Sequence, residues 1–233
     1  MVDIEQNKIK FLGYLNQYCS KREGIDRIID MLNRTDFFVA PASKKYHLAV
    51  EGGTCSHSLG VFYNMLDLLA IDSKSKIVFD LVDRIKKGDS LLEDDYKTLD
   101  EATKNVFGEK VCFISLVLTA LLHDCHKINF YEKVEKSVYK GLDEKGKKVF
   151  ETEIQYQMRE DRLIFGNVGT NSNYIITSYM KLTFEEQLAI ENHHGVDING
   201  NQLPASGTAW SKSKLALYLH LADMKAAFTE DKE

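Results

Sequence analysis

The chain has 233 residues but only two prolines, and none of its apolar runs is long. Because proline breaks helices, its scarcity leaves room for long helical segments, and apolar residues recur at helical spacing through much of the chain. The sequence therefore predicts a mainly helical protein. A membrane-spanning helix needs roughly 18 consecutive apolar residues, and no run approaches that length, so we expect no membrane association.

The chain also has no excess of basic residues, and its cysteines are not arranged in close pairs. The four cysteines form no CxxC pair, and the N-terminal segment does not resemble a signal peptide. We therefore expect reduced thiols and a cytoplasmic location. The formal net charge is −5, so no overall basic field attracts a nucleic-acid backbone. A local basic groove would still suffice, so nucleic-acid binding is left open.

Apolar periodicity and capping residues predict the positions of the helices. They cover 4–19, 24–34, 56–71, 110–125, 183–194 and 211–228, with one helix and a shorter one near 95–105 within 73–109, and another after a loop within 160–180. Ser56 is the expected N-cap of one helix, and Thr183 forms a capping box with Glu186. Pro41 and the following glycine pair predict a loop over 37–54.

Residues 134–156 have a different character, with two β-prone arms around a turn that contains Gly146. This pattern predicts a β-hairpin inserted at the edge of the helical core. The hairpin and the next loop, 160–173, carry many lysines and arginines, so we expect either a solvated hairpin or a lid near the functional site that selects the substrate. The predicted helices, joined by short loops, favour a single all-α domain.

Side chains that bind cations stand near the ends of the predicted helices or inside the last one. An aspartate among apolar neighbours on a helix is costly to bury without a cation or hydrogen-bond donors. Imidazole nitrogens and carboxylate oxygens together suit borderline divalent cations and can leave positions for water and phosphate. The candidate groups are His57, His123, Asp124, His193, His194 and Asp223.

Three sequence blocks make the pattern more specific. They read APASKKYHLAVEGGTCSHSLGV, LLHDCHKINFY and LHLADMKAAF, and they occur in that order. With the H…HD…D pattern they carry, they resemble the HD phosphohydrolase superfamily, including bacterial and phage HD proteins and HD-domain 3′-to-5′ exoribonucleases. The resemblance covers roughly 36–228. It implies one HD-domain helical bundle at 36–233 with a small β-hairpin insertion at about 134–156, preceded by helices at 1–35.

The resemblance also implies roles for individual residues. Asp124 and Lys127 would be catalytic, with Lys127 close to the substrate phosphate, where a cation offsets developing negative charge. His47, which matches the entry block, joins Lys127 as an expected substrate-binding residue. Arg162 is expected to bind the substrate for a different reason, as one of the basic residues of the hairpin and the loop after it. His126 and His220 are expected to be structural. The implied metal ligands are His57, His123, Asp124 and Asp223, and the groups expected to serve a second metal or a phosphate are His193, His194 and Asn167.

One departure bears on the number of metal ions. Relatives carry a GHGE segment whose histidine helps to bind a second metal, whereas this chain reads FGNVGTN and has Asn167 at that position. An amide is a weaker ligand than imidazole for borderline cations. We therefore expect one divalent cation per chain, from among Mn, Ni, Co, Fe, Zn and Mg.

A metal-dependent phosphohydrolase is the function that follows. It would hydrolyse a phosphate ester or anhydride of a nucleotide or another phosphorylated small molecule, as a nucleotidase, dNTPase or phosphodiesterase. Two alternatives stay open. One is a non-catalytic nucleotide-binding or protein-interaction module with a degenerate HD site. The other is a 3′-to-5′ exonuclease on short RNA or DNA. A homo-oligomer is compatible with each of them.

Overall fold

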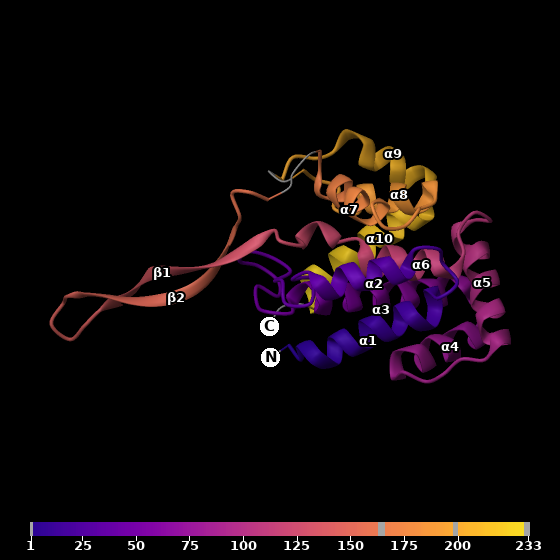
Figure 1. Cartoon of the computed structure of the whole chain (residues 1–233), viewed down its shortest axis with the longest axis horizontal. Coiled ribbons are helices and arrows are strands. Elements are labelled where there is room, and N and C mark those ends of the chain that lie inside the picture. The colour runs from indigo at the N-terminus through magenta and orange to yellow at the C-terminus, as the bar shows by residue number, and fades with distance from the viewer. Residues whose placement is uncertain (1, 163–165, 198–199, 231–233) are drawn as a thin grey trace.

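The computed structural model describes residues 2–162, 166–197 and 200–230. Helices form most of this part of the chain, and two strands form a single antiparallel sheet (Figure 1). The helices are α1 (Ile4–Cys19), α2 (Ile25–Arg34), α3 (Gly53–Ser73), α4 (Lys76–Lys87), α5 (Glu93–Phe107), α6 (Phe113–Leu122), α7 (Val168–Thr177), α8 (Phe184–Asn192), α9 (Pro204–Lys212) and α10 (Lys214–Lys225), with a 3-10 turn η1 (Cys125–Lys127) and a π turn η2 (Ala226–Glu230). The strands are β1 (Tyr131–Leu142) and β2 (Lys148–Met158).

The mainly helical fold with a hairpin is confirmed, and three details of the prediction are wrong. The segment 73–109 does contain two helices, but the second, α5, is the longer of the two rather than a short one. Helix α9 was not predicted. Helix α3 begins at Gly53 rather than after a Ser56 cap, because Gly52 takes the left-handed conformation (φ 78°) and starts the helix earlier. None of the described helices has the length and apolar character needed to cross a membrane.

Helices α3, α6 and α10 form the centre of the molecule. Helix α3 packs against α6, α10, α4, α5 and α1. Nine of the ten residues of α6 are buried, which explains why its sequence, FISLVLTALL, has no polar face. The N-terminal helices contribute to the same core through side chains such as Phe11 and Leu32. This shared core holds the ends of α3, α6, α8 and α10 in fixed positions.

The hairpin is the one part of the described chain that leaves this body. Strands β1 and β2 pair along their length, with an irregularity between Tyr139 and Gly141, and extend away from the helices (Figure 1). The turn over Asp143–Lys147 is closed by hydrogen bonds from Gly146 N to Asp143 O (2.9 Å) and from Asp143 N to Lys147 O (2.9 Å). The predicted hairpin is confirmed and is slightly longer than predicted at both ends.

Gly169 marks a place where two helices touch backbone to backbone. A Cβ atom added there would lie 2.4 Å from the carbonyl oxygens of Ile190 and Glu191 on α8. Gly169→Ala must push α7 away from α8, so we expect unfolding to become easier by about 1–3 kcal/mol. Thermal unfolding should show this as a fall of roughly 2–4 °C for each kcal/mol in a chain of this size.

Gly13 provides the matched control for that substitution. It also lies inside a helix, α1, but no atom comes within 4 Å of its added Cβ. Gly13→Ala should therefore stabilise the protein by about 0.5–1 kcal/mol through helix propensity. Equal melting temperatures for the two variants would contradict the close approach of α7 to α8.

Candidate metal centre

The first turns of α3 position His57 against a loop. A Cβ on Gly53 would lie 2.2 Å from Leu48 O and 2.6 Å from Ala42 N, so only glycine allows the helix to start this close to the loop. His57 follows one turn later and is buried. Its Nε2 atom lies 2.8 Å from Oδ1 of Asp223 on α10, which is 166 residues further along the chain.

The end of α6 supplies His123 and Asp124, and the turn that follows places Lys127 beside them. His123 is the C-cap of α6, and Asp124 stands before the 3-10 turn η1. Because side chains three residues apart lie on the same side of a 3-10 turn, Nζ of Lys127 lies 2.8 Å from Oδ2 of Asp124. The same Nζ donates to the carbonyl of Ala42 in the loop before α3. Lys127 therefore holds Asp124 in place and ties η1 to that loop.

Helices α8 and α10 complete the cluster. The predicted capping box is present, since Thr183 and Glu186 exchange hydrogen bonds at the start of α8, and His193 is the C-cap at its end. Asp223 lies near the end of α10, one turn beyond His220, whose Nδ1 atom is 2.6 Å from the carbonyl oxygen of His193. These contacts join the two helix segments that carry His193 and Asp223.

The spacing of the donor atoms fits one cation. Ligands 2.0–2.2 Å from a divalent cation lie about 3–3.5 Å from each other. Besides the His57–Asp223 pair, Nε2 of His123 lies 3.5 Å from Oδ2 of Asp124 and 3.8 Å from Oδ1 of Asp223. Nε2 of His57 lies 3.7 Å from Oδ2 of Asp124. The four predicted ligands therefore converge, and this buried histidine–aspartate group could hold a metal ion.

Three buried polar atoms in this cluster lack a hydrogen-bond partner: Nε2 of His123, Nε2 of His193 and Oδ1 of Asp124. The Nδ1 atoms of the two histidines lie 2.8 Å from Ala120 O and 2.7 Å from Ile190 O. A proton on each Nδ1 donates to those carbonyls and leaves each Nε2 with a lone pair directed into the cluster. Unpartnered buried atoms are costly, and a cation would satisfy all three.

The local charges also favour a cation. Burial lowers the pKa of His123 to about 4, so its imidazole is neutral and able to bind metal. Burial alone would raise the pKa of Asp124, but Lys127 and the neighbouring imidazoles hold it well below its usual range. Burial alone would lower the pKa of His193, yet Asp124 and Asp223 raise it. Burial alone would also raise the pKa of Asp223, but the hydrogen bond to His57 holds it well below its usual range, so the centre keeps two ionised carboxylates and stabilises positive charge.

The structure brings three further predicted residues to this centre or beside it, namely His193, His194 and His47. The donor atoms of His193, His194 and Asp223 all lie within 4.8 Å of one another, and His193 Nε2 is 3.6 Å from Oδ1 of Asp124. His194 is exposed, in contrast to the others. The ring of His47 lies 5.1 Å from that of His57.

His126 is buried, and its backbone N–H donates to Ser172 Oγ on α7, in agreement with the structural role predicted for it.

Two other predicted residues have their contacts elsewhere. Asn167 caps α7, where its side chain accepts from Thr170 N (2.9 Å) and donates to Glu191 (3.0 Å). Arg162 donates to the carbonyl of Arg159, lies over the Phe130 ring and lines a separate cavity near the root of the hairpin. Both side chains are held by neighbours close to them rather than by the histidine–aspartate cluster.

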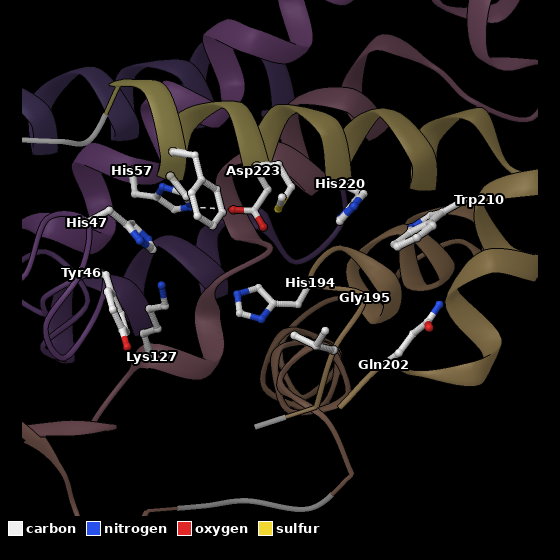
Figure 2. A pocket seen from close by; sticks show the side chains of 14 residues that line it. Tyr46, His47, His57, Lys127, His194, Gly195, Gln202, Trp210, His220 and Asp223 are labelled. Atoms are coloured by element: carbon white, nitrogen blue, oxygen red, sulfur yellow. Dashed lines mark hydrogen bonds and ion pairs between the residues drawn. The ribbon is translucent and has the colours of Figure 1, made fainter. Parts of the chain in front are cut away.

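A cavity of about 960 Å³ opens onto the cluster. His57 and Lys127 lie at one end, Trp210 and Gln202 lie at the other, and His194 stands between them (Figure 2). No hairpin residue lines this cavity, so the hairpin does not have the position expected of a lid. The other lining residues are Tyr46, His47, Gly195, Val196, His220, Asp223, Met224, Ala227 and Phe228.

The aromatic and apolar walls of this cavity were not predicted from the sequence. The ring of Trp210, the one tryptophan in the chain, stacks on that of His220, with centroids 4.1 Å apart. Gly195 has φ 71°, and an added Cβ would lie 2.7 Å from the Trp210 ring, so glycine is needed where the ring leans on the backbone. Tyr46 is 87% exposed beside His47. A lone tryptophan and an exposed tyrosine next to a candidate residue were the available signals.

Comparison of the chain with protein-family models, with curated proteins and with solved structures gives no match.

Proposed function

We propose that the protein is a divalent-metal-dependent phosphohydrolase of the HD type that acts on a nucleotide, with one cation per chain. The observation that carries this proposal is the convergence of His57, His123, Asp124 and Asp223 around unpartnered donor atoms at one end of a large cavity. A divalent cation at such a centre supplies Lewis acidity to a phosphoryl oxygen and to water.

The residues of the chain itself divide the remaining work. His123 and His193 are held in fixed tautomers by the carbonyls of α6 and α8, so their Nε2 atoms stay directed inward. Lys127 reaches the same cavity with a positive charge that stabilises negative charge on a phosphate. Asp124, ionised and buried, is oriented by Lys127 and can accept a hydrogen bond from an attacking water.

The far end of the cavity suits the nucleoside half of the substrate. Its walls include the ring of Trp210, and the amide of Gln202 beside it can both donate and accept hydrogen bonds. A flat base with polar edges is the kind of group that such a mixed aromatic and amide surface accommodates. The volume of about 960 Å³ lies at the upper end of the range for small-molecule sites.

The test is a substrate panel with defined metal loading. The metal-free protein and the protein loaded with Mn²⁺, Ni²⁺, Co²⁺, Fe²⁺, Zn²⁺ or Mg²⁺ are mixed with nucleoside monophosphates, dNTPs, cyclic nucleotides and short RNA or DNA. Released phosphate and nucleoside are measured. We expect hydrolysis of one nucleotide class with metal and none after chelation. Nucleotide binding without hydrolysis under every metal would instead identify a binding module, and shortening of oligonucleotides alone would identify an exonuclease.

Lys127→Met separates the role of the lysine from that of the metal ligands. Methionine keeps much of the side-chain length but removes the charge, so we expect turnover to fall by roughly 10–100-fold while the bound cation stays at one per chain. Metal content by elemental analysis and steady-state kinetics measure the two effects. Lys133→Met, which removes an exposed lysine paired with Glu51, is the control. Loss of the cation from Lys127→Met would show that the lysine serves the metal centre instead.

A further inference from the structure

The two faces of the β-hairpin differ in chemistry. Residues directly opposite each other on paired strands share a face, and the face alternates along each strand. Tyr139 is opposite Phe150. Ile154 is opposite Glu135, four residues nearer the root, and therefore lies on the same face. Beyond the irregularity, Leu142 is opposite Lys148 on the same face. One face of the hairpin thus carries Tyr139, Leu142, Phe150 and Ile154, which we call the apolar face.

The apolar face is open to solvent. Its four side chains are 50%, 61%, 56% and 67% exposed, in chain order. On the opposite face, polar side chains of the two strands pair with each other. Lys140 and Glu153 form an ion pair, and Gln157 donates a hydrogen bond to Glu132 (2.7 Å). An isolated two-stranded hairpin is marginally stable in water unless its apolar face is covered. The described chain itself offers no cover, since the hairpin extends away from the helices (Figure 1).

We propose that the apolar face is a dimerisation surface, on which the hairpin of a second copy of this chain packs face to face. This inference does not depend on the proposed phosphohydrolase activity, because no residue that lines the cavity beside the histidine–aspartate cluster belongs to the hairpin.

Charge favours a second copy over other partners. Between residues 131 and 158, six lysines are balanced by six aspartates and glutamates. A segment without net charge has no general attraction for nucleic acid or for an anionic lipid surface. Two identical surfaces related by a twofold axis must be complementary to themselves, and an apolar patch with balanced charge meets this condition, whereas a patch of one sign would repel its copy.

The available area is also adequate. Four side chains of this size, each about half exposed, present on the order of 400 Å² of apolar surface. A standard interface buries about 800 Å² on each partner, and a little over half of it is apolar. Polar residues of the same face, such as Glu135, Ser137 and Thr152, can supply the remainder. Because the hairpin projects from the helical body, two hairpins can meet while the bodies stay apart (Figure 1).

Sedimentation of the full chain over a wide range of concentrations is the first test. We expect the parent to sediment as a dimer of the 26.6 kDa chain and the double variant Phe150→Thr with Ile154→Thr to sediment as a monomer. Threonine retains strand propensity, so the hairpin can persist. The control is Val138→Thr with Val149→Thr on the opposite face, which should remain dimeric. A monomeric parent at every concentration, or a double variant that stays dimeric, would overturn the proposal.

A second measurement does not depend on the double variant folding normally. Thr152 and Glu151 are exposed neighbours on opposite faces of β2. We expect labelling of Thr152→Cys by a thiol reagent to slow as the protein concentration rises, by about tenfold where nine chains in ten are paired, whereas labelling of Glu151→Cys should not change. Equal concentration dependence at both sites would contradict packing through the apolar face.

Binding to vesicles of anionic phospholipid tests the alternative that the apolar face contacts a lipid surface rather than a second copy of the chain. If the parent sediments with such vesicles through Phe150 and Ile154 while the free chain stays monomeric, the apolar face binds lipid and the dimer proposal fails. Absence of vesicle binding together with a concentration-dependent dimer supports the proposal.

Discussion

Asp124→Asn is expected to remove the divalent cation and, with it, phosphohydrolase activity. Asp124 provides one oxygen near His57, His123 and Lys127 and the other near His193, so no other carboxylate in the cluster contacts as many partners. An asparagine of nearly the same volume keeps the packing but replaces an anionic ligand by a neutral amide. We expect cation affinity and turnover each to fall by at least about a hundredfold.

Calorimetric cation titration and kinetics on the preferred nucleotide measure the two losses, and circular dichroism checks that the variant remains folded. The control is Asp72→Asn, which changes an exposed carboxylate on α3 that accepts a hydrogen bond from Tyr218. If Asp124→Asn is folded and binds the same cation as tightly as the parent, the metal centre lies elsewhere.

Glu186→Ala is expected to cause the largest loss of stability. The carboxylate of Glu186 is fully buried and accepts from Ser115 Oγ (2.7 Å) and from the backbone N–H of Thr183 (2.7 Å), and it pairs with Arg22. It thereby links α8 to α6 and to the segment after α1. Alanine would leave these donors without their acceptor, which should lower the free energy of unfolding by about 3–5 kcal/mol.

In a chain of this size that loss corresponds to a fall in melting temperature of roughly 6–20 °C. The neighbouring Glu185→Ala is the control, because Glu185 is only half-buried and accepts a hydrogen bond from Ser213 Oγ (2.9 Å), so it should cost only about 1 kcal/mol. Glu186→Gln, which keeps one acceptor oxygen, should lie between the two. Similar melting temperatures for the two alanine variants would show that the buried carboxylate contributes little.

The helices that could be predicted from sequence are those whose pattern is local. Helix α6 follows from a continuous apolar run, and α8 from its capping box. Helix α9 could not be predicted, because its sequence, PASGTAWSK, has weak periodicity and a glycine. It is held by tertiary contacts, since Ser206 Oγ and Trp210 Nε1 both bond to Asn192 on α8.

In the candidate site, too, some residues could be predicted from the sequence, whereas the positions of others depend on tertiary contacts. His57, His123, Asp124 and Asp223 were predicted as a group, and the packing of α3, α6 and α10 brings them together. Arg162 was expected near the substrate because it follows the hairpin in sequence. Its position instead depends on a tight turn that returns it to Phe130 and Arg159, which no sequence pattern revealed. The end of the cavity around Trp210 and Gln202 is formed by residues from separate segments of the chain, so no local sequence pattern could predict it.

The distance along the chain between His57 and Asp223 has a thermodynamic consequence. A cation shared by these two residues cross-links points 166 residues apart. Closing so long a loop in the unfolded chain is entropically unfavourable, so the ligand atoms are scattered there and bind the cation weakly. Nearly all of the binding free energy then adds to the stability of the folded state and grows with the logarithm of free cation concentration. The melting temperature should therefore rise steadily as each candidate metal is titrated, and the metal that raises it at the lowest concentration is the one that the centre prefers.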